Sequence, residues 1–197
     1  YLQIIWDDGA SDKYLIIGHI DGGYFDYFTL YNENDKPFFR HGLVVSMDNS
    51  EYSFFPRVFP PERISATSAL REGNIIYSTD NLDRRLDICW AVRGGVGEKI
   101  IIQTHYEIAE ICISIGFISF TRPHLYRQNS RPKKLRISYE GEAPKIVELA
   151  DTYHLQSLRT SSYHGNGKKI WIEILEVYPG TRFNDTCINF FMYDTGQ

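Results

Sequence analysis

Apolar and polar residues alternate along the chain from about Ile64 onward. In the run "LRISYEG", Leu135, Ile137 and Tyr139 fall on one face and polar residues on the other, as in a strand with one buried face. The runs "KIIIQTHYEI", "EICISIGFISF" and "DTCINFFMY" are rich in β-branched and aromatic residues. Such runs, separated by turn signals at roughly 8 to 12 residue spacing, predict an antiparallel all-β sandwich or barrel.

The same alternation returns near the C-terminus in the run "KKIWIEILEVY". Ile170, Ile172 and Ile174 alternate with Trp171 and Glu173, and a Gly-Asn-Gly turn precedes the run. We therefore predict another half-buried strand at this position.

The first part of the chain is also strand-like. The runs "KYLIIGHI" and "YFDYFTLY" flank a "DGG" turn, and "FFRHGLVVSM" follows the polar segment "NENDKP", which together predict a small β-meander. The prolines of "FFPRVFPPERI" exclude that segment from the centre of a sheet. We predict a β-rich segment with a Pro-rich connector over residues 1–61 and a separate domain over residues 62–197. The first part is either the tail of a larger domain or a set of extra strands packed on the second.

Composition supports strands and narrows the function. Aromatic residues make up 15% of the chain, and the net charge is -4, which argues against a general nucleic-acid binder because phosphate binding needs a basic face. No run of about 18 apolar residues exists, so no transmembrane segment is predicted. The chain starts at Tyr1 without a leader, and we expect a mature or trimmed chain.

Signatures of catalysis are missing from the sequence. It holds no Gly-x-Ser-x-Gly elbow, no His-Glu-x-x-His helix and no phosphate loop, and the Gly-rich "RGGVGEK" leads into a strand rather than a helix. Cys89, Cys112 and Cys187 lack metal spacing and lie in apolar runs, which predicts buried free thiols, with one disulfide left open if the protein is exported. The histidines are scattered as well. We predict no enzyme, no cofactor and no metal site.

One stretch departs from the acidic character of the chain. The segment "FTRPHLYRQNSRPKKLRI", Phe120 to Ile137, holds six Lys or Arg and no acid. A nucleic-acid patch, a ligand-binding loop and a solvated strand edge all fit this pattern. Lys133, Lys134 and Arg136 are interpreted as outward-facing strand residues that deter edge pairing.

The part of the stretch that precedes this strand suits a ligand loop. Arginine offers a planar fork for hydroxyls and anions, tyrosine offers a flat stacking face, and the prolines lower the ordering cost of binding. The candidate ligand-binding residues are Arg122, His124, Tyr126, Arg127 and Arg131.

The order of several pieces resembles a known family. The pieces are "ATSALREGNIIYSTDNLDRRLDICW", "GVGEKI", "LYRQNSRPKKLRI", "LADTYHLQSL" and "ILEVYPGTRFNDTCI", which span about residues 64 to 190. They resemble the discoidin or coagulation-factor type C domains with the galactose-binding-like jelly roll. The nearest branch is the domain that accompanies a secreted NAD glycohydrolase and aids its translocation.

The resemblance implies an eight-stranded jelly-roll sandwich with ligand loops at one end. Carried onto this chain, the loops are Ser68 to Asn74, Ala91 to Glu98 and Phe120 to Pro132, and Arg93 joins the candidate ligand-binding residues. Members of this superfamily are mostly non-catalytic binding modules for glycans, and some bind lipid head groups or proteins.

A structural calcium of many relatives is not expected in this chain. The resemblance places the calcium segment at "DRRLDICW", where Asp83 is kept but Arg84 and Arg85 replace a glycine and an aspartate. Calcium needs several oxygen ligands, and two arginines beside the site would repel it.

The sequence therefore favours a non-catalytic module for a carbohydrate or cell-surface ligand, acting outside the cell, in the periplasm or at the cell surface. Two alternatives stay open. One is an accessory or translocation domain of an exported enzyme or toxin. The other is a binder of anionic lipid or nucleic acid that uses the basic loop, although DNA is not an expected partner.

Overall fold

The computed structural model describes most of the second part of the chain and three strands of the first. The described residues are 2–5, 11–21, 24–31, 64–82, 86–103, 107–108, 110–158, 163–164 and 169–194.

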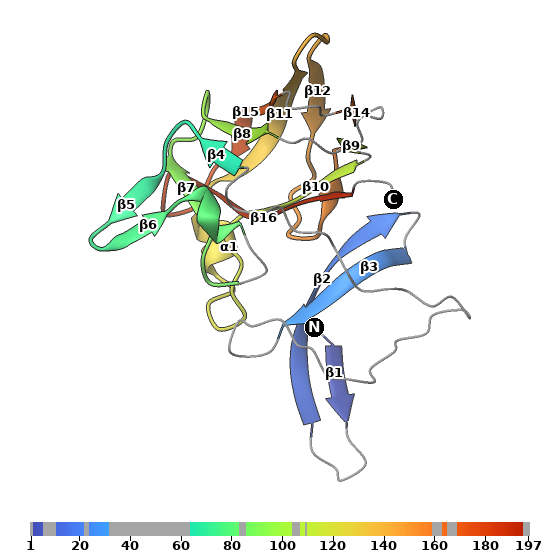
Figure 1. Cartoon of the computed structure of the whole chain (residues 1–197). Helices are drawn as coiled ribbons and strands as arrows, with labels where there is room; N and C mark the ends of the chain where they lie inside the picture. Colours follow the sequence, from blue (N-terminus) through green and yellow to red (C-terminus); the bar gives the residue numbers. More distant parts are fainter. Residues whose placement is uncertain are drawn as a thin grey trace.

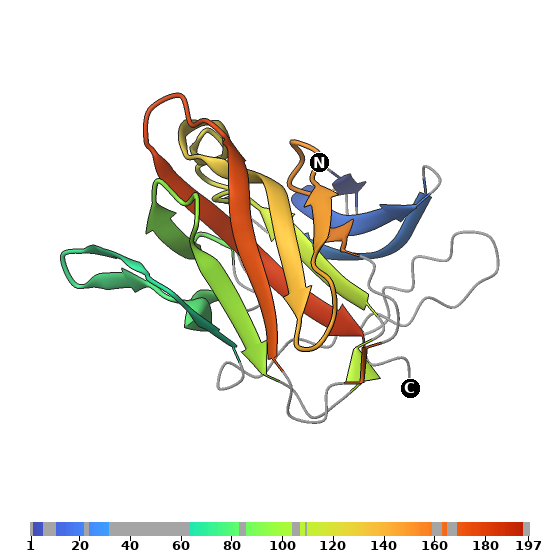
Figure 2. The same cartoon turned by 90° about the horizontal axis from the view of Figure 1, so that it is seen from above.

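Two antiparallel sheets face each other and form a sandwich (Figure 2). The four-stranded sheet, in the order β13-β10-β16-β7, is built from β7 (Trp90–Arg93), β10 (Glu110–Ile115), β13 (Gln156–Ser157) and β16 (Asp185–Asp194). The five-stranded sheet, in the order β12-β11-β15-β8-β4, is built from β4 (Ile64–Ala66), β8 (Lys99–Gln103), β11 (Arg131–Tyr139), β12 (Lys145–Glu148) and β15 (Lys169–Tyr178). The predicted all-β jelly-roll sandwich is confirmed, with four and five strands in its two described sheets instead of eight in all.

The core lies between the two sheets and follows the predicted alternation. Leu135 and Ile137 on β11 are buried and pack in one cluster with Ile111 and Ile113 on β10, in the opposite sheet. Burial of alternate residues fixes the register of each strand, because a slip by one position would turn the apolar set toward water.

Strand β15 crosses the middle of the five-stranded sheet. It pairs with β11 on one side and with β8 on the other, with Ile172 opposite both Ile137 and Ile100. Ile170, Ile172 and Ile174 are all buried, which confirms the half-buried strand predicted from their spacing.

The basic residues of β11 have a different role from the predicted one. β11 lies between β12 and β15, so Lys133, Lys134 and Arg136 do not protect a sheet edge. Arg136 pairs instead with Glu173 at 3.0 Å, and both lysines pair with Glu176, Lys133 at 3.3 Å. Acidic residues on the neighbouring strand thus balance the positive charge of this half of the basic stretch.

Three strands near the N-terminus form a separate antiparallel sheet beside the sandwich (Figure 1). They are β1 (Leu2–Ile5), β2 (Ser11–Asp21) and β3 (Tyr24–Tyr31), in the order β1-β2-β3. The predicted hairpin around the "DGG" turn is therefore present as β2 and β3, and the third described strand is β1. The predicted strand "FFRHGLVVSM" and the Pro-rich connector lie outside the described residues.

The N-terminal sheet contacts the sandwich through β2. Leu15 is buried in one cluster with Leu86, Cys112, Ile118 and Leu155 of the second part. This contact fits the alternative in which the first strands pack on the sandwich, while the domain boundary near residue 61 stays a prediction.

Short elements complete the fold. They are the hairpin β5 (Leu70–Glu72) and β6 (Ile75–Tyr77), the 3₁₀ turn η2 (Thr79–Asn81), the pair β9 (Glu107–Ile108) and β14 (Tyr163–His164), and the helix α1 (Leu125–Gln128). In the described part of the chain, no helix is long and apolar enough to cross a membrane.

Candidate functional site

A pocket of about 200 Å³ opens between the β5–β6 hairpin, the segment that leads into α1 and the start of β16. We call it the loop-end pocket. Its apolar lining comes from Leu70, Ala91, Leu125 and Cys187, its aromatic lining from Tyr77, Phe117 and Phe183, and its polar lining from Glu72, Arg122, Asn129 and Asp185.

The β5–β6 hairpin supplies one wall. Glu72 pairs with Ile75 across a two-residue turn formed by Gly73 and Asn74, which is a typical hairpin connection. The hairpin projects from the sandwich near β7 (Figure 1). Residues at alternate positions share a face of the hairpin, which places Glu72 and Leu70 together on the pocket side.

The segment between β10 and α1 supplies the opposite wall. Gly116 ends β10 with φ +94°, and a Cβ there would lie 2.6 Å from the Tyr126 ring, so only glycine fits this turn. The turn places Phe117 in the pocket, and the Arg122 guanidinium carbon lies 5.6 Å from the centre of the Phe117 ring. The Arg122 backbone N–H donates to Ser119 Oγ at 3.2 Å, which fixes the arginine at the start of this wall.

The loop between β15 and β16 supplies the third wall. The Phe183 N–H donates to the Gln128 carbonyl at 2.8 Å, and the Ser130 N–H donates to the Asp185 carbonyl at 2.9 Å. A Cβ on Gly180 would collide with the carbonyl oxygens of Phe183 and Gln128, so this close approach also requires glycine. The loop is thereby fixed to the end of α1, with Phe183 and Asp185 held at the pocket.

Two carboxylates face the pocket from different walls. The Tyr77 hydroxyl donates to Glu72 Oε2 at 3.3 Å, and burial together with the negative charge of Glu72 raises the pKa of Tyr77 to about 12. Burial and the same Glu72 charge raise the pKa of Asp185, while Arg93 acts in the opposite direction. The pocket therefore combines aromatic faces, hydrogen-bond acceptors and one guanidinium.

The floor of the pocket contains two thiols. Cys187 lines the pocket, and Cys89 packs beside it in a cluster with Ala91 and Phe117. Burial and the neighbouring Cys187 thiol raise the pKa of Cys89. All three cysteines are buried and free, as predicted from their apolar settings.

Most of the predicted basic loop gathers on a different side, around Asp151. Arg131 Nε donates to Asp151 Oδ1 at 2.7 Å, Arg127 Nη1 donates to Oδ2 at 2.7 Å, and the Tyr126 hydroxyl donates to Oδ1 at 3.0 Å. Partial burial alone would raise the pKa of Asp151, but the hydrogen bonds from Arg131 and Tyr126 outweigh it and hold that pKa below its ordinary value. We call this group the Asp151 cluster.

The hydrogen bonds of the Asp151 cluster join α1 and the start of β11 to the segment that follows β12. Arg131 is only 3% exposed, and its remaining donors point at the backbone carbonyls of Tyr126 and Asn129. Tyr126 is buried as well, with its hydroxyl used by Asp151. The polar atoms of Arg131 and Tyr126 therefore bond within the chain, and the ligand-binding role predicted for these two residues stays a prediction.

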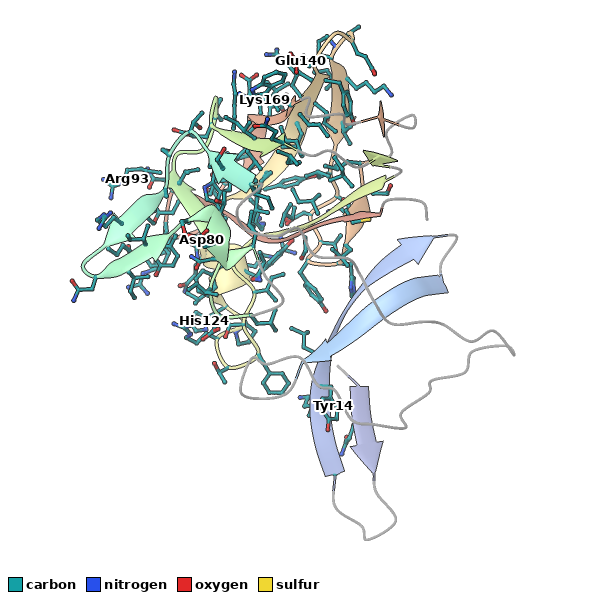
Figure 3. The ribbon with its side chains drawn as sticks, viewed as in Figure 1. Tyr14, Asp80, Arg93, His124, Glu140 and Lys169 are labelled. Carbon is teal, nitrogen blue, oxygen red and sulfur yellow. The ribbon has the colours of Figure 1, made fainter. Side chains whose placement is uncertain are left out.

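The other predicted site residues are exposed. His124 precedes α1, and Arg127 lies on α1 with its side chain 65% exposed. Arg93 lies on β7 directly across from Asp185, and Figure 3 shows it near the β5–β6 hairpin. Of the predicted residues, Arg122 lines the loop-end pocket, Arg93 lies next to it, and His124 and Arg127 lie outside its lining.

Of the candidate residues named from the sequence, only Arg122 lines the pocket, although the loop ranges drawn from the resemblance contain more than half of the lining residues. The loop ranges drawn from the resemblance contained Glu72 and Asn129, and one quoted piece of the resemblance, "ILEVYPGTRFNDTCI", contained Phe183 and Asp185. Tyr77 and Phe117 are spaced like ordinary strand residues, so no local signal marked them. The candidate residues were chosen mainly for their positive charge, and for this reason Arg127 and Arg131 were included.

Metal binding has no support in the described part of the chain, where no group of three or more His, Cys, Asp or Glu is placed to hold an ion. Asp83, Arg84 and Arg85 lie outside the described residues. The predicted lack of calcium at that segment stays a prediction.

The two sheets and the loop-end pocket define the class of this domain as an all-β sandwich with a pocket at one end. The family described as "NAD glycohydrolase translocation F5/8 type C domain" matches residues 59–194, and the chain belongs to this family. The resemblance stated from the sequence, including its nearest branch, is confirmed.

Solved structures with a similar fold include two complexes. The family 32 CBM from C. perfringens NanJ in complex with galactose is 15% identical, with a TM-score of 0.46, and the match covers 66% of this chain and 92% of that one. The CBM32 of AlyQ in complex with 4,5-unsaturated mannuronic acid is 15% identical, with a TM-score of 0.42 and the same 66% and 92% coverage. The comparison with curated proteins found no match.

Proposed function

We propose that this chain is a non-catalytic module that binds a carbohydrate unit in the loop-end pocket. The observation that carries the proposal is the lining, in which the rings of Tyr77, Phe117 and Phe183 accompany the polar side chains of Glu72 and Arg122. Aromatic faces pack against the C–H face of a sugar ring, and carboxylates and guanidinium groups hydrogen-bond to its hydroxyls. The pocket volume of about 200 Å³ lies below the range typical of drug-sized ligands and favours a single sugar unit over a long chain segment.

The decisive experiment compares two arginines of the same segment. Arg122 lines the pocket, whereas Arg127 is exposed on α1 outside the lining. We expect glycan-array binding by the wild-type chain, with heparin and DNA as controls, and loss of at least about tenfold in affinity for Arg122→Ala and Phe117→Ala. Arg127→Ala is the matched control and should bind like wild type.

The opposite result would indicate a different binding site. Binding that survives Arg122→Ala and fails in Arg127→Ala would place the ligand on the basic loop near α1. If no glycan binds, the carbohydrate proposal is wrong. Binding only to heparin or DNA, with steep weakening as salt rises, would favour the anionic-ligand alternative.

The family description favours a second candidate function. A translocation domain acts together with an enzyme that is delivered elsewhere, so the chain would serve as an accessory domain of an exported enzyme or toxin. The test is to delete residues 62–197 from the full-length protein and to measure delivery and enzyme activity separately. Loss of delivery with activity retained supports this function, and unchanged delivery contradicts it.

Both candidate functions share a location. A module for external glycans, or one that delivers a secreted enzyme, acts outside the cell or at a cell surface. Fractionation of the native host, with detection of the chain by antibody, tests this. Recovery only from the cytoplasm would contradict it.

A further inference from the structure

The charges of the loop-end pocket do not match the basic stretch that the sequence emphasised. Among the lining residues, Glu72 and Asp185 are acidic and Arg122 is basic, so the lining carries an excess of negative charge. The lysines and arginines of β11 and of the Asp151 cluster are paired elsewhere.

Asp185 is fixed in place, and the positive charge that acts on it is that of Arg93 on the neighbouring strand, which opposes the increase that burial causes in the pKa of Asp185 without forming an ion pair in the described structure. Its backbone carbonyl accepts the Ser130 N–H at 2.9 Å, and residue 185 begins β16 opposite Arg93. The described residues form no ion pair with Asp185, although its side chain is partly buried. A partly buried carboxylate without a partner is costly, and a hydrogen-bond donor from a ligand would offset that cost.

Glu72 adds a second negative charge from another wall. Its Oε2 accepts the Tyr77 hydroxyl, which orients the carboxylate without neutralising its charge. Both carboxylates line the pocket, and burial together with the negative charge of Glu72 raises the pKa of Asp185. A ligand carboxylate placed here would add a third like charge, whereas an amino group would relieve the repulsion.

Arg122 does not cancel this preference. Its guanidinium lies over the Phe117 ring, and its backbone is fixed by Ser119, so its charge stays on the wall opposite the hairpin. Like Asp185, it forms no ion pair among the described residues. Arg122 is therefore available to bind hydroxyls on one side of a sugar ring, while the two carboxylates face the other side.

We propose that Asp185 and Glu72 make the loop-end pocket selective for sugars that carry an amino group, with neutral sugars second and acidic sugars excluded. This inference rests on the proposed carbohydrate-binding function and names the class of sugar. Charge selection is carried by Asp185, which forms no ion pair among the described residues, and Glu72 strengthens it.

The test uses matched sugars that differ in one group. Galactosamine, galactose and galacturonic acid, and the corresponding glucose series, are coupled to the same polymer through the anomeric carbon. Within the series that binds, we expect the amino sugar to bind most tightly, the neutral sugar next and the acidic sugar least, with affinities of the first and the last that differ at least about tenfold. In Asp185→Asn the ratio of the affinity for the amino sugar to the affinity for the acidic sugar should decrease at least about fivefold, while the affinity for the neutral sugar changes less.

A charge control separates local from global effects. Glu140→Gln removes the same charge at the far end of the sandwich, where Figure 3 labels Glu140, and it should leave the order unchanged. Circular dichroism and the melting temperature verify that each variant is folded. A change of order in Glu140→Gln equal to that in Asp185→Asn would mean that net charge alone is responsible and would overturn the proposal.

Other outcomes are equally decisive. If acidic sugars bind as tightly as amino sugars, or if Asp185→Asn leaves the order intact, the charge selection is wrong while carbohydrate binding stands. If no sugar of either series and no glycan on the array binds, the proposed function itself is wrong, and the inference falls with it.

Discussion

Replacing Asp151 by asparagine should destabilise the fold strongly, although Asp151 lies in a surface segment between strands. Its carboxylate accepts one hydrogen bond each from Arg131 Nε, Arg127 Nη1 and the Tyr126 hydroxyl, and a further one from Arg131 Nη2 at 3.1 Å. An asparagine keeps the shape but carries no charge, and one of its two acceptors becomes a donor. The buried guanidinium of Arg131 is then left without a counter-ion.

The expected loss of stability can be estimated from the burial of Arg131 and Asp151. Removing one member of a buried pair costs about 3 to 5 kcal/mol, because the other charge is left uncompensated. The Arg131 side chain is 4% exposed, which justifies this range, but the Asp151 side chain is 23% exposed, so water compensates part of the loss. We expect a decrease of about 3 kcal/mol in the free energy of unfolding, which corresponds to roughly 6 to 12 °C in the melting temperature for a chain of this size.

Urea unfolding followed by circular dichroism measures this change, with an unchanged m-value as the sign that the unfolded state is unaffected. Arg127→Ala is the matched control, because Arg127 also contacts Asp151 but is 65% exposed. Its cost should stay below about 1 kcal/mol. A cost below about 1 kcal/mol for Asp151→Asn, or an equal cost for both variants, would refute the view that the Arg131–Asp151 pair holds the loop.

Three further predictions follow from the same contacts. The pKa of Asp151 is lowered in the folded chain, so the stability that its charge contributes should be complete above the ordinary aspartate pKa and be lost as the pH falls through the lowered value. Melting curves from about pH 7 to pH 2 should therefore show a steeper decrease of the melting temperature in wild type than in Asp151→Asn. The raised pKa and full burial of Cys89 predict slow alkylation of this thiol in the folded chain and fast alkylation in urea. Mass spectrometry measures both rates, and fast modification without urea would contradict the burial of Cys89. Gly180→Ala should displace the loop that carries Phe183, because its Cβ would collide with backbone oxygens, and should reduce ligand binding at least about tenfold; wild-type affinity in a folded Gly180→Ala chain would contradict this geometry.

The sandwich was predictable because its core obeys a local rule. Alternating isoleucines such as Ile170, Ile172 and Ile174 report burial of one face within a few residues of sequence. Which strands lie next to each other was harder to predict, because strand pairing depends on contacts between residues that are distant in sequence. The basic residues of β11 show this. Their outward-facing pattern was predicted, but their partners Glu173 and Glu176 lie on β15, which is separated from β11 by three further strands along the chain.

The candidate site was predictable only in outline. The order of resembling pieces indicated which loops meet at one end, and Arg122 was named from its residue type. Residue type alone could not separate Arg122 from Arg131, because both are arginines of one basic stretch beside aromatic residues. Arg131 differs from Arg122 in its pairing with Asp151, which follows the next strand, β12, so this pairing is a property of the tertiary fold.

The charge of the pocket shows most clearly why function needs the fold. Glu72 and Asp185 come from opposite ends of the domain sequence, and neither stands in a run of acidic residues. The sandwich brings β5 and the start of β16 to the same end and points both carboxylates at one small pocket. In the basic stretch Phe120 to Ile137, five of the six lysines and arginines form ion pairs with Asp151, Glu173 or Glu176, and Arg122 is the exception among them. A ligand responds to the charges that remain unpaired at the pocket, so the sign of its preferred charge depends on which lining side chains the fold leaves without ion pairs. Among the described residues Asp185 and Arg122 form no ion pair, and they line different walls of the pocket.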